Sequence, residues 1–343
     1  MAGEKGPAKV TIHDVAARAG VSIATVSRVL SASRPVSLEL RDRVVAAVEE
    51  LGYQANLLGR ALRQGRSFSL GLVVPDLENP YFAVLAQQAT RAFSKSDIDV
   101  YVYSADNDLK LERRAIQSFL GRQVDGIIII PCDERESTAN VRLANRSAVT
   151  TQLDRFARSV RTHYVGCDNA YGIRLIAAHL REAADLARQP VIFIGARPTS
   201  STAHERLDAF AKAFPRAEQI LGSFSFEWGR HAMTGLMRRG LKAASVVTGA
   251  DIIALGVLAA AQAHGFLVPD DFRVTGFDGI GVTYLAYPTL TTVRQPVDQM
   301  TDTIVDIIRA RFDGTGPPAT VVERFKPTLI LGESSPAQIG APQ

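Results

Sequence analysis

The chain has 343 residues, more than a single hydrophobic core normally organises, so two or three domains are expected. Hydrophobic residues make up 46% of the chain, yet no run of 18 apolar residues occurs and the N-terminus is polar, which argues against a membrane span or a secretory signal and favours the cytoplasm. The two cysteines, Cys132 and Cys167, are too few for a disulfide framework, and both are expected to be small buried residues. Their spacing is not that of zinc ligands, and no metal or cofactor is expected.

The N-terminal region carries the charge imbalance of the chain. Residues 1–66 contain ten Lys or Arg against six Asp or Glu, and their net charge of +4 equals that of the whole chain. The basic excess therefore lies in one short region, where a polyanion would bind.

Two short helices joined by a glycine turn are predicted within this region. The first begins at Thr11, because Asp14 can bond back to the Thr11 amide, and it ends at Gly20, since glycine takes a left-handed conformation without steric cost. The second is capped by Ser22. Its inward side carries Val26, Val29 and Leu30, and its outward side carries Ile23, Ala24, Thr25, Ser27 and Arg28. This arrangement predicts a helix-turn-helix that reads DNA.

A third helix is predicted from about Ser37. Its buried stripe consists of Leu40, Val44, Val48 and Leu51. Three such helices can close one small core. Their periodicity also fits a helical dimerisation or protein-binding module, and it is the basic excess that favours DNA.

From residue 68 onward, short apolar runs alternate with amphipathic stretches. The predicted strands span residues 70–74, 100–104, 126–131, 149–153, 191–194, 245–248 and 273–276. The predicted helices include residues 81–93, 109–120, 170–186, 204–214 and 252–264. This alternation predicts parallel sheets covered by helices on both faces.

Several motifs resemble the lactose-repressor (LacI/GalR) family of bacterial transcription regulators. They are VTIHDVAARAGVSIATVSRVL from Val10, RDRVVAAVEELGY from Arg41, GLVVPDLENPYFA from Gly71, GFDG from Gly276 and LTTVRQPV from Leu290. The resemblance implies an all-α helix-turn-helix domain with a hinge helix, followed by an α/β periplasmic-binding-protein-like core of two doubly wound parallel-sheet subdomains.

The resemblance also implies where these parts begin and end. The DNA-binding domain and hinge would occupy residues 1–66, and the core, which binds the effector and forms the dimer, residues 67–343. Within the core, the N-subdomain would comprise about 67–166 plus 296–326. The C-subdomain would comprise about 167–295 plus 327–343.

The family's base-contacting positions match Ile23, Ala24 and Arg28. An arginine can pair bidentately with guanine in the major groove, whereas isoleucine and alanine offer only apolar contact, for example to a thymine methyl group. The hydroxyl groups that would contact phosphates belong to Ser22, Thr25 and Ser27. One such reader buries too little surface for tight specificity, so a homodimer on a pseudo-palindromic operator is expected.

The linker from Asn56 to Arg63 is too short, and too interrupted by Gly59, to be a stable isolated helix in water. In the family this hinge becomes a helix on operator binding, and a leucine matching Leu62 enters the minor groove and bends the duplex. Asn56 and Leu62 are therefore expected DNA contacts. Ala55 stands where the family commonly has proline, so a looser hinge or a plain flexible linker is the alternative.

The resemblance further implies an effector site between the core subdomains, where small ligands bind at strand carboxyl ends. The polar residues that match effector-binding positions of the family are Asp154, Arg206 and Asp278, and the aromatic residues are Tyr81, Phe82 and Phe224. Many sugar-responsive relatives have Asn-Asp where this chain has Ala250 and Asp251. Asp251 is therefore either a ligand contact or a helix cap, and a different effector, or none, stays open.

No phosphate loop, G-x-S-x-G or H-E-x-x-H motif occurs, so an enzyme is not expected. A free sugar-binding protein would not need residues 9–63. The chain is expected to be a cytoplasmic, homodimeric transcription regulator, a repressor more than an activator, whose affinity for operator DNA is modulated by a small sugar-like effector. The alternative is a regulator controlled by a protein partner or without an effector.

Overall fold

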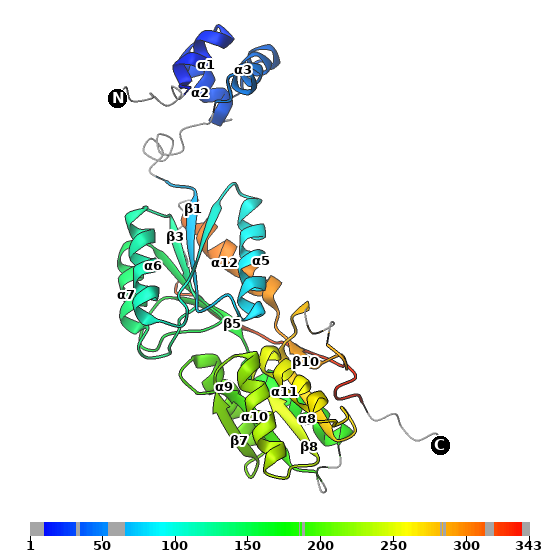
Figure 1. Cartoon of the computed structure of the whole chain (residues 1–343). Helices are drawn as coiled ribbons and strands as arrows, with labels where there is room; N and C mark the ends of the chain where they lie inside the picture. The colour runs from blue at the N-terminus through cyan, green and yellow to red at the C-terminus, as the bar shows by residue number, and fades with distance from the viewer. Residues whose placement is uncertain are drawn as a thin grey trace, which may run out of the picture. The chain divides into compact units, whose positions relative to one another are not determined.

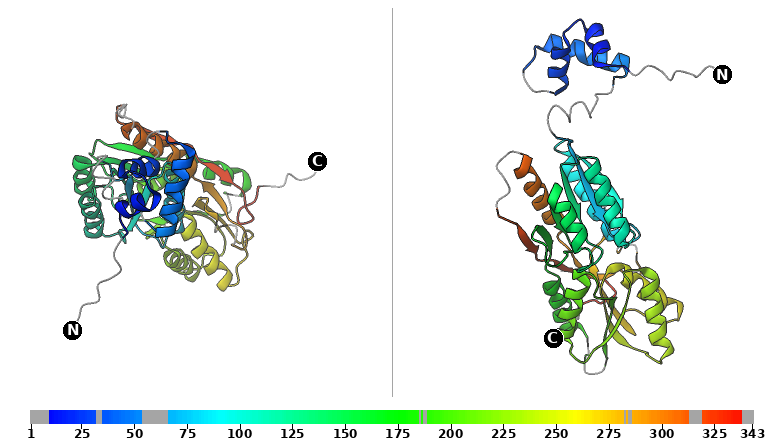
Figure 2. Two further views of the ribbon diagram at one scale, coloured as in Figure 1. Left: turned by 90° about the horizontal axis from the view of Figure 1, so that it is seen from above. Right: turned by 90° about the vertical axis from the view of Figure 1, so that its left-hand side faces the viewer.

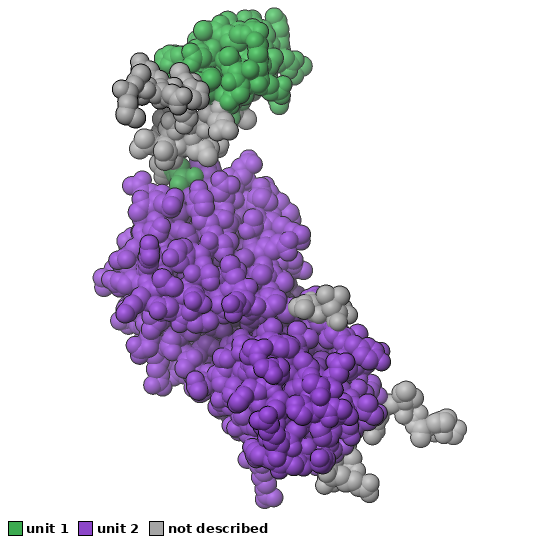
Figure 3. Space-filling model, in the orientation of Figure 1, with its two compact units in different colours: residues 1–67 green, residues 68–343 purple. Residues whose placement is uncertain are grey.

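The structure is a computed structural model that describes residues 10–31, 35–53, 66–184, 186, 189–281, 283, 286–312 and 319–337. Tertiary contacts divide the chain into two units, Met1–Ser67 and Phe68–Gln343, which Figure 3 shows in different colours. Among the helices that lie in the described ranges, none has the length and apolar character that a membrane span requires.

The first unit contains three helices, α1 (Ile12–Ala19), α2 (Ile23–Ser31) and α3 (Leu38–Leu51). The Thr11 amide donates to the Asp14 carboxylate at 2.8 Å where α1 begins, and Gly20 ends that helix with φ 64°. The small core that the helices enclose consists of Val15, Ala16, Ala19, Val26, Val44 and Ala47. The prediction that Leu30 points inward is wrong, because this core contacts α2 at Val26 and Val29, and Leu30 remains 37% exposed.

The turn between α1 and α2 is held from the third helix. The guanidinium of Arg43 on α3 donates to the carbonyl oxygens of Ala19 and Gly20 at 2.6 and 3.2 Å. These carbonyls lie at the end of α1 and have no partner within that helix. Arg43 thereby fixes the direction in which α2 leaves the turn.

The second unit is built on two six-stranded sheets (Figure 1). The first sheet has the order β11-β5-β4-β3-β1-β2, and all its neighbouring strands are parallel. Its strands are β1 (Ser69–Val74), β2 (Asp99–Ser104), β3 (Gly126–Ile129), β4 (Val149–Leu153), β5 (His163–Cys167) and β11 (Val322–Phe325). In the central ladder Leu72 lies between Val102 and Ile128, and every residue of β1 and β3 is buried.

The second sheet has the order β12-β10-β9-β8-β6-β7. Its strands are β6 (Val191–Ala196), β7 (Glu218–Gly222), β8 (Ala244–Thr248), β9 (Phe272–Asp278), β10 (Thr291–Arg294) and β12 (Thr328–Ile330). All its pairs are parallel except that β12 runs antiparallel to β10. The predicted parallel sheets are thus confirmed, with one antiparallel edge strand added.

Helices cover both faces of each sheet (Figures 1 and 2). In the N-subdomain, α5 (Pro80–Ser94) packs beside α12 (Val297–Phe312) on one face, and α6 (Leu109–Gly121) packs beside α7 (Thr138–Ser147) on the other. In the C-subdomain, the two layers are formed by α8 (Asn169–Ala183) with α9 (Ser201–Ala213) and by α10 (Phe226–Arg238) with α11 (Asp251–Ala263). The chain passes between the sheets after β5, after β10 and after β11.

Both cysteines are buried and unpaired, as predicted. Cys167 is fully buried and Cys132 is 8% exposed. Burial raises the pKa of both thiols above its ordinary value, so neither forms a reactive thiolate near neutral pH.

Candidate functional site

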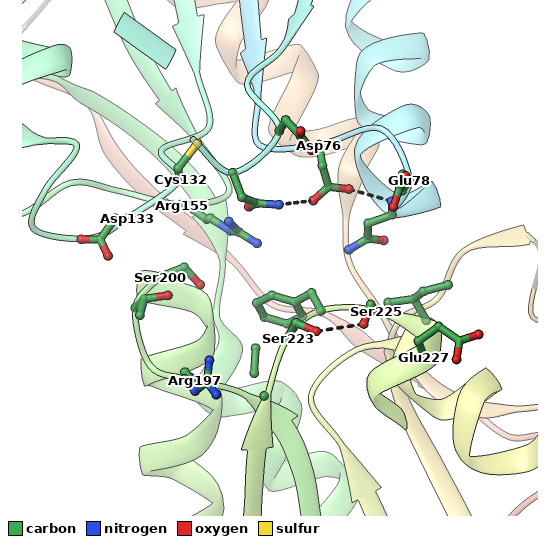
Figure 4. A pocket seen from close by; sticks show the side chains of 18 of the residues that line it. Asp76, Glu78, Cys132, Asp133, Arg155, Arg197, Ser200, Ser223, Ser225 and Glu227 are labelled. Atoms are coloured by element: carbon green, nitrogen blue, oxygen red, sulfur yellow. Dashed lines mark hydrogen bonds between the residues drawn. The ribbon is translucent and has the colours of Figure 1, made fainter. Parts of the chain in front are cut away.

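A cavity of about 590 Å³ lies between the two subdomains of the second unit (Figure 4). Its N-subdomain wall is formed by the loops that follow β1, β2, β3 and β4, and its C-subdomain wall by the loops that follow β6 and β7 and by the start of α11. The walls are thus built largely from loops at the carboxyl ends of parallel strands. Open α/β sheets bind ligands at this edge.

A buried carboxylate in the N-subdomain fixes one of these loops. Glu112 on α6 has no exposed surface, and it accepts from the Cys132 amide at 2.8 Å and from the Ser137 hydroxyl at 2.9 Å. Asn140 on α7 donates to the same carboxyl group at 2.8 Å. The loop after β3 therefore presents Cys132 to the cavity from a fixed position.

Hydrogen bonds across the cleft hold the subdomains together beside the cavity. The amide of Glu134 donates to the carbonyl oxygen of Thr199 at 2.7 Å, and the amide of Phe156 donates to the hydroxyl of Ser201 at 3.0 Å. The first bond joins an N-subdomain loop to the loop between β6 and α9, and the second joins another to the first residue of α9. A relative movement of the subdomains would break both bonds.

A second, smaller compartment adjoins the cavity and shares Asn79, Arg155 and Phe224 with it. Its volume is about 10 Å³, which leaves room for at most about one water molecule. Its remaining lining residues are Tyr81, Phe82, Asp154, Thr202, Arg206 and Asp278. Six of the seven residues proposed from the sequence to bind an effector therefore lie together here.

Asp251 is the exception, because it lines neither compartment. Its fully buried carboxylate accepts from the amides of Gly279 and Ile280 at 2.7 and 3.1 Å and from the Thr292 hydroxyl at 2.5 Å. The alternative prediction, that Asp251 caps the helix, is wrong, since the N-cap of α11 is Ala250 and Asp251 is the first helical residue. Asp251 instead fixes the loop that follows Asp278.

Asp278 lies at the centre of a buried hydrogen-bond network. Its carboxylate accepts from Arg206 at 3.2 Å and from the Gln295 side-chain amide at 2.9 Å. Arg206 also donates to the Asn169 side chain and to the Gly249 carbonyl oxygen, each at 2.8 Å. These bonds connect the ends of β8 and β9 with α8 and α9.

Burial dominates the protonation of the carboxyl groups in this network. It raises the pKa of Asp278 to about 7, although the nearby Arg206 opposes the shift. Burial likewise raises the pKa of Asp251 to about 6. It also raises the pKa of Asp154, although the nearby Arg206 and Arg155 favour the ionised form of that carboxyl group. With pKa values of about 6 and about 7, Asp251 and Asp278 change charge near neutral pH, and such groups cluster at functional sites.

Both carboxylates at the inner compartment sit on unusual backbone. Asp154 has φ 61° and Asp278 has φ 135°, in the region that favours glycine. Asp154 directly follows β4, and Asp278 is the last residue of β9. The Tyr81 hydroxyl donates to the Asp154 carboxylate at 3.0 Å. Backbone of this kind persists where surrounding contacts hold it, often at ligand sites.

Arg155, Asn79 and Thr202 line the inner compartment but were not predicted from the sequence, and Arg155 is the charged residue among them. Its side chain is only 5% exposed, and its guanidinium carbon lies 5.0 Å from the centre of the Phe82 ring and 5.2 Å from that of Phe224. Its Nε has no hydrogen-bond partner among the described residues, and its ion-pair distance to Asp154 is 4.0 Å. The one signal in the sequence was its place directly after Asp154 at a strand end.

The proposed DNA-reading side chains lie on α2 of the first unit. The Ser22 hydroxyl accepts from the Thr25 amide at 3.1 Å, which confirms its role as a cap. Ile23 is 41% exposed, and Ala24 and Arg28 are also exposed. Thr25 and Ser27 are half-buried, less exposed than expected. Asn56 and Leu62, the proposed hinge contacts, lie outside the described residues.

Comparison with known proteins decides between the possible classes. Residues 11–56 match the profile "Bacterial regulatory proteins, lacI family", and residues 178–335 match the profile "Periplasmic binding protein-like domain". The chain is 32% identical to the HTH-type transcriptional regulator AscG of Escherichia coli (strain K12) over 335 residues, which cover 94% of this chain and 98% of that protein. The chain belongs to the LacI family.

Other LacI-family proteins support the same conclusion. The chain is 30% identical over 295 residues to the ribose operon repressor of Halalkalibacterium halodurans, covering 84% of this chain and 86% of that protein. The lac repressor dimer bound to operator and the anti-inducer ONPF has the same fold, with a TM-score of 0.82 at 24% identity over 96% of this chain and all of that one. The CelR–cellobiose complex gives a TM-score of 0.69 at 25% identity, over 95% of this chain and all of that one.

This LacI-family chain is therefore a DNA-binding transcriptional regulator. Its first unit carries the helix-turn-helix, and its second unit is the periplasmic-binding-protein-like core that contains the cleft.

Proposed function

We propose that this LacI-family regulator is a cytoplasmic repressor that binds a pseudo-palindromic operator as a homodimer, and that a sugar-like effector in the core cleft changes its operator affinity. The observation that carries the effector assignment is the convergence of six predicted residues on one buried compartment at the strand ends. No catalytic role is proposed for these residues.

The helix-turn-helix supports the DNA-binding part of the proposal. Arg28, Ile23 and Ala24 are exposed on α2, and the bonds from Arg43 fix the turn that aims this helix. Arg28 and the two apolar side chains would read base edges in the major groove, and the hydroxyl groups of Ser22 and Thr25 would contact phosphates. A dimer would repeat this reading on a second half-site.

The chemistry of the inner compartment supports a polyhydroxylated effector. Phe82 belongs to the N-subdomain and Phe224 to the C-subdomain, and both rings flank the guanidinium of Arg155. Aromatic faces bury the apolar C–H faces of a sugar ring, and the charged groups around them accept and donate hydrogen bonds to its hydroxyl groups. Donors are available on Arg155 and Arg206, and acceptors on Asp154 and Asp278.

Selection of duplexes from a randomised library with the full-length protein tests the DNA-binding part. The proposal predicts enrichment of two inverted half-sites with a fixed spacing, because a dimer presents two recognition helices. Enrichment of a single half-site, or of no sequence, would contradict it.

Thermal unfolding of the full-length protein in the presence of sugars tests the effector part. A sugar at about 100 times its dissociation constant should stabilise the folded core by roughly 2.7 kcal/mol. The stabilisation should be lost in Phe224→Ala, which removes one ring of the pair. If no neutral sugar stabilises the core, a regulator controlled by a protein partner or without an effector becomes the better account.

A further inference from the structure

The two compartments of the cleft differ greatly in size. The inner compartment contains the residues that match the family's effector positions, yet it holds only about 10 Å³. The outer one holds about 590 Å³, a volume within the range of about 300–1,000 Å³ that is typical of small-molecule pockets. The inner compartment is too small for a sugar ring, so a ring that contacts Phe224 and Arg155 would lie in the outer compartment and leave the part of it nearer Phe226 to water.

The outer compartment has an aromatic side chain of its own. Phe226, half-buried at the start of α10, lines the outer compartment but not the inner one. Phe224, two residues earlier, lines both. The loop after β7 thus offers one aromatic side chain at the junction of the compartments and a second one further out.

The outer wall also offers acceptors that are not already used. Glu78 and Asp106 form no hydrogen bond or ion pair with any residue in the described part of the chain. The Asp76 carboxylate, by contrast, already has hydrogen-bond partners. It accepts from the Asn79 amide at 2.8 Å and from the Asn107 side chain at 2.9 Å, and both bonds are drawn in Figure 4. Two free carboxylates suit the hydroxyl groups of a second sugar unit.

The charges of the outer wall disfavour an anionic ligand. Its acidic residues are Asp76, Glu78, Asp106, Asp133 and Glu227, and its basic residues are Arg155 and Arg197. A phosphate or carboxylate group in this compartment would face more negative than positive charge. The wall therefore selects against sugar phosphates and sugar acids.

A buried, unused donor lies where the compartments meet. Arg155 lines both compartments, its side chain is 5% exposed, and its Nε has no partner among the described residues. Burying an N–H donor without an acceptor is costly, so a ligand oxygen that accepts from the Arg155 Nε is favoured at this point. The oxygen that links two sugar units would pass beside this guanidinium.

We propose that the effector is an uncharged glycoside of at least two sugar units, with one unit beside Phe224 and Arg155, where the two compartments meet, and the next further out in the outer compartment against Phe226. Its outer hydroxyl groups donate to Glu78 and Asp106. This inference rests on the proposed effector function of the cleft and adds the class of sugar to it.

Calorimetric titration of the full-length protein with matched sugars tests the inference. The panel pairs glucose with cellobiose and maltose, galactose with lactose and melibiose, and xylose with xylobiose, and it adds ribose and glucose 6-phosphate. We expect one disaccharide to bind at least about tenfold more tightly than its own monosaccharide unit. A monosaccharide that binds as tightly as any of its glycosides, or a preference for glucose 6-phosphate, would overturn the inference.

Variants of the outer wall separate the inference from the proposed function. The double variant Glu78→Gln, Asp106→Asn should lower the affinity for the disaccharide towards that of its monosaccharide and leave the monosaccharide affinity unchanged. Glu136→Gln, an exposed carboxylate that lines neither compartment, is the matched control. An unchanged disaccharide affinity in the double variant would overturn the inference while the effector function stands. If no sugar of either size binds, the proposed function itself fails.

Discussion

Arg206 donates to Asp278 at 3.2 Å, and each of the two side chains is only 3% exposed. Both residues were predicted as effector contacts, yet the bond between them also joins α9 to the end of β9. Loss of sugar binding in a variant of either residue would therefore not distinguish a ligand contact from a damaged core. Phe224, Glu78 and Asp106 are better tests, because no described residue forms a hydrogen bond or ion pair with their side chains.

Arg206→Ala should strongly destabilise the core. At a pH above about 7, where Asp278 is ionised, removing Arg206 leaves this carboxylate buried without its cation, which typically costs about 3–5 kcal/mol. Urea unfolding followed by the fluorescence of Trp228, the only tryptophan of the chain, measures this loss in the second unit. Arg239→Ala is the matched control, since its ion pair with Glu218 is exposed and its loss should change stability little. Equal effects of the two variants would show that the buried pair does not stabilise the core.

The stability of the core should fall as the pH rises from about 4 to 7. Burial raises the pKa of Asp278 from 3.8 to about 7, so in this range the folded protein holds a proton that the unfolded chain has released. The free energy of unfolding therefore decreases with rising pH until Asp278 is ionised, and Asp251 adds a shift of the same sign.

Asp278→Asn tests the assignment of this pH dependence. The amide keeps an oxygen acceptor for Gln295 but does not titrate, so the slope of unfolding free energy against pH should become shallower between pH 4 and 7. Urea titrations at half-unit pH intervals measure the slope. An unchanged slope in the variant would assign the titration to other groups.

The packing of α10 against α11 depends on a close approach at Gly229. A Cβ atom there would lie 2.1 Å from the carbonyl oxygen of Ile253, so Gly229→Ala should force the helices apart and destabilise the core by about 1–3 kcal/mol. Gly235→Ala in the same helix is the control: apart from the neighbouring residues and backbone of its own helix, no described atom lies within 4 Å of the added Cβ, and the change should stabilise by about 0.5–1 kcal/mol. Thermal unfolding of both variants measures the two changes in stability. A Gly229→Ala variant that is more stable than the unmodified protein would contradict the close contact.

Arg28→Ala should reduce discrimination between operators. A bidentate contact to guanine contributes about 1–3 kcal/mol of preference, so the variant should bind the selected operator more weakly while its binding to unrelated DNA changes little. Arg41→Ala, an exposed arginine on α3, is the control. Repeating the duplex selection with both variants measures the preference. If the Arg28 variant selects the same sequence with the same stringency, Arg28 does not read the base.

Most inner strands could be predicted from the sequence because their burial leaves near-continuous apolar runs, as in Leu70 to Val74. The inner strands β5 and β10 were missed, and of the four edge strands only β2 was predicted. β11 has three exposed residues out of four, and β7 begins with Glu218 and Gln219, so neither shows an apolar run. Their pairing comes from neighbours distant in the chain, which local patterns do not reveal.

The functional site, too, could be predicted from the sequence only in part. Tyr81, Phe82 and Phe224 were placed in the cleft because they match positions of a related fold. The role of Asp251 in holding a loop could not be predicted. The amides that donate hydrogen bonds to its carboxylate belong to residues 279 and 280, which only the folded chain brings near. Arg155 was missed because an arginine after a strand reads as a solvated charge, and its burial between two rings depends on both subdomains.

The most direct test of the whole account is the linkage between operator and effector. Fluorescence anisotropy gives the operator affinity of the full-length protein without and with a saturating amount of the sugar that stabilises the core. Calorimetry gives the affinity for the same sugar with and without operator. We expect the sugar to change operator affinity, and the operator to change sugar affinity by the same factor. An operator affinity that is identical at saturating sugar would contradict this expectation.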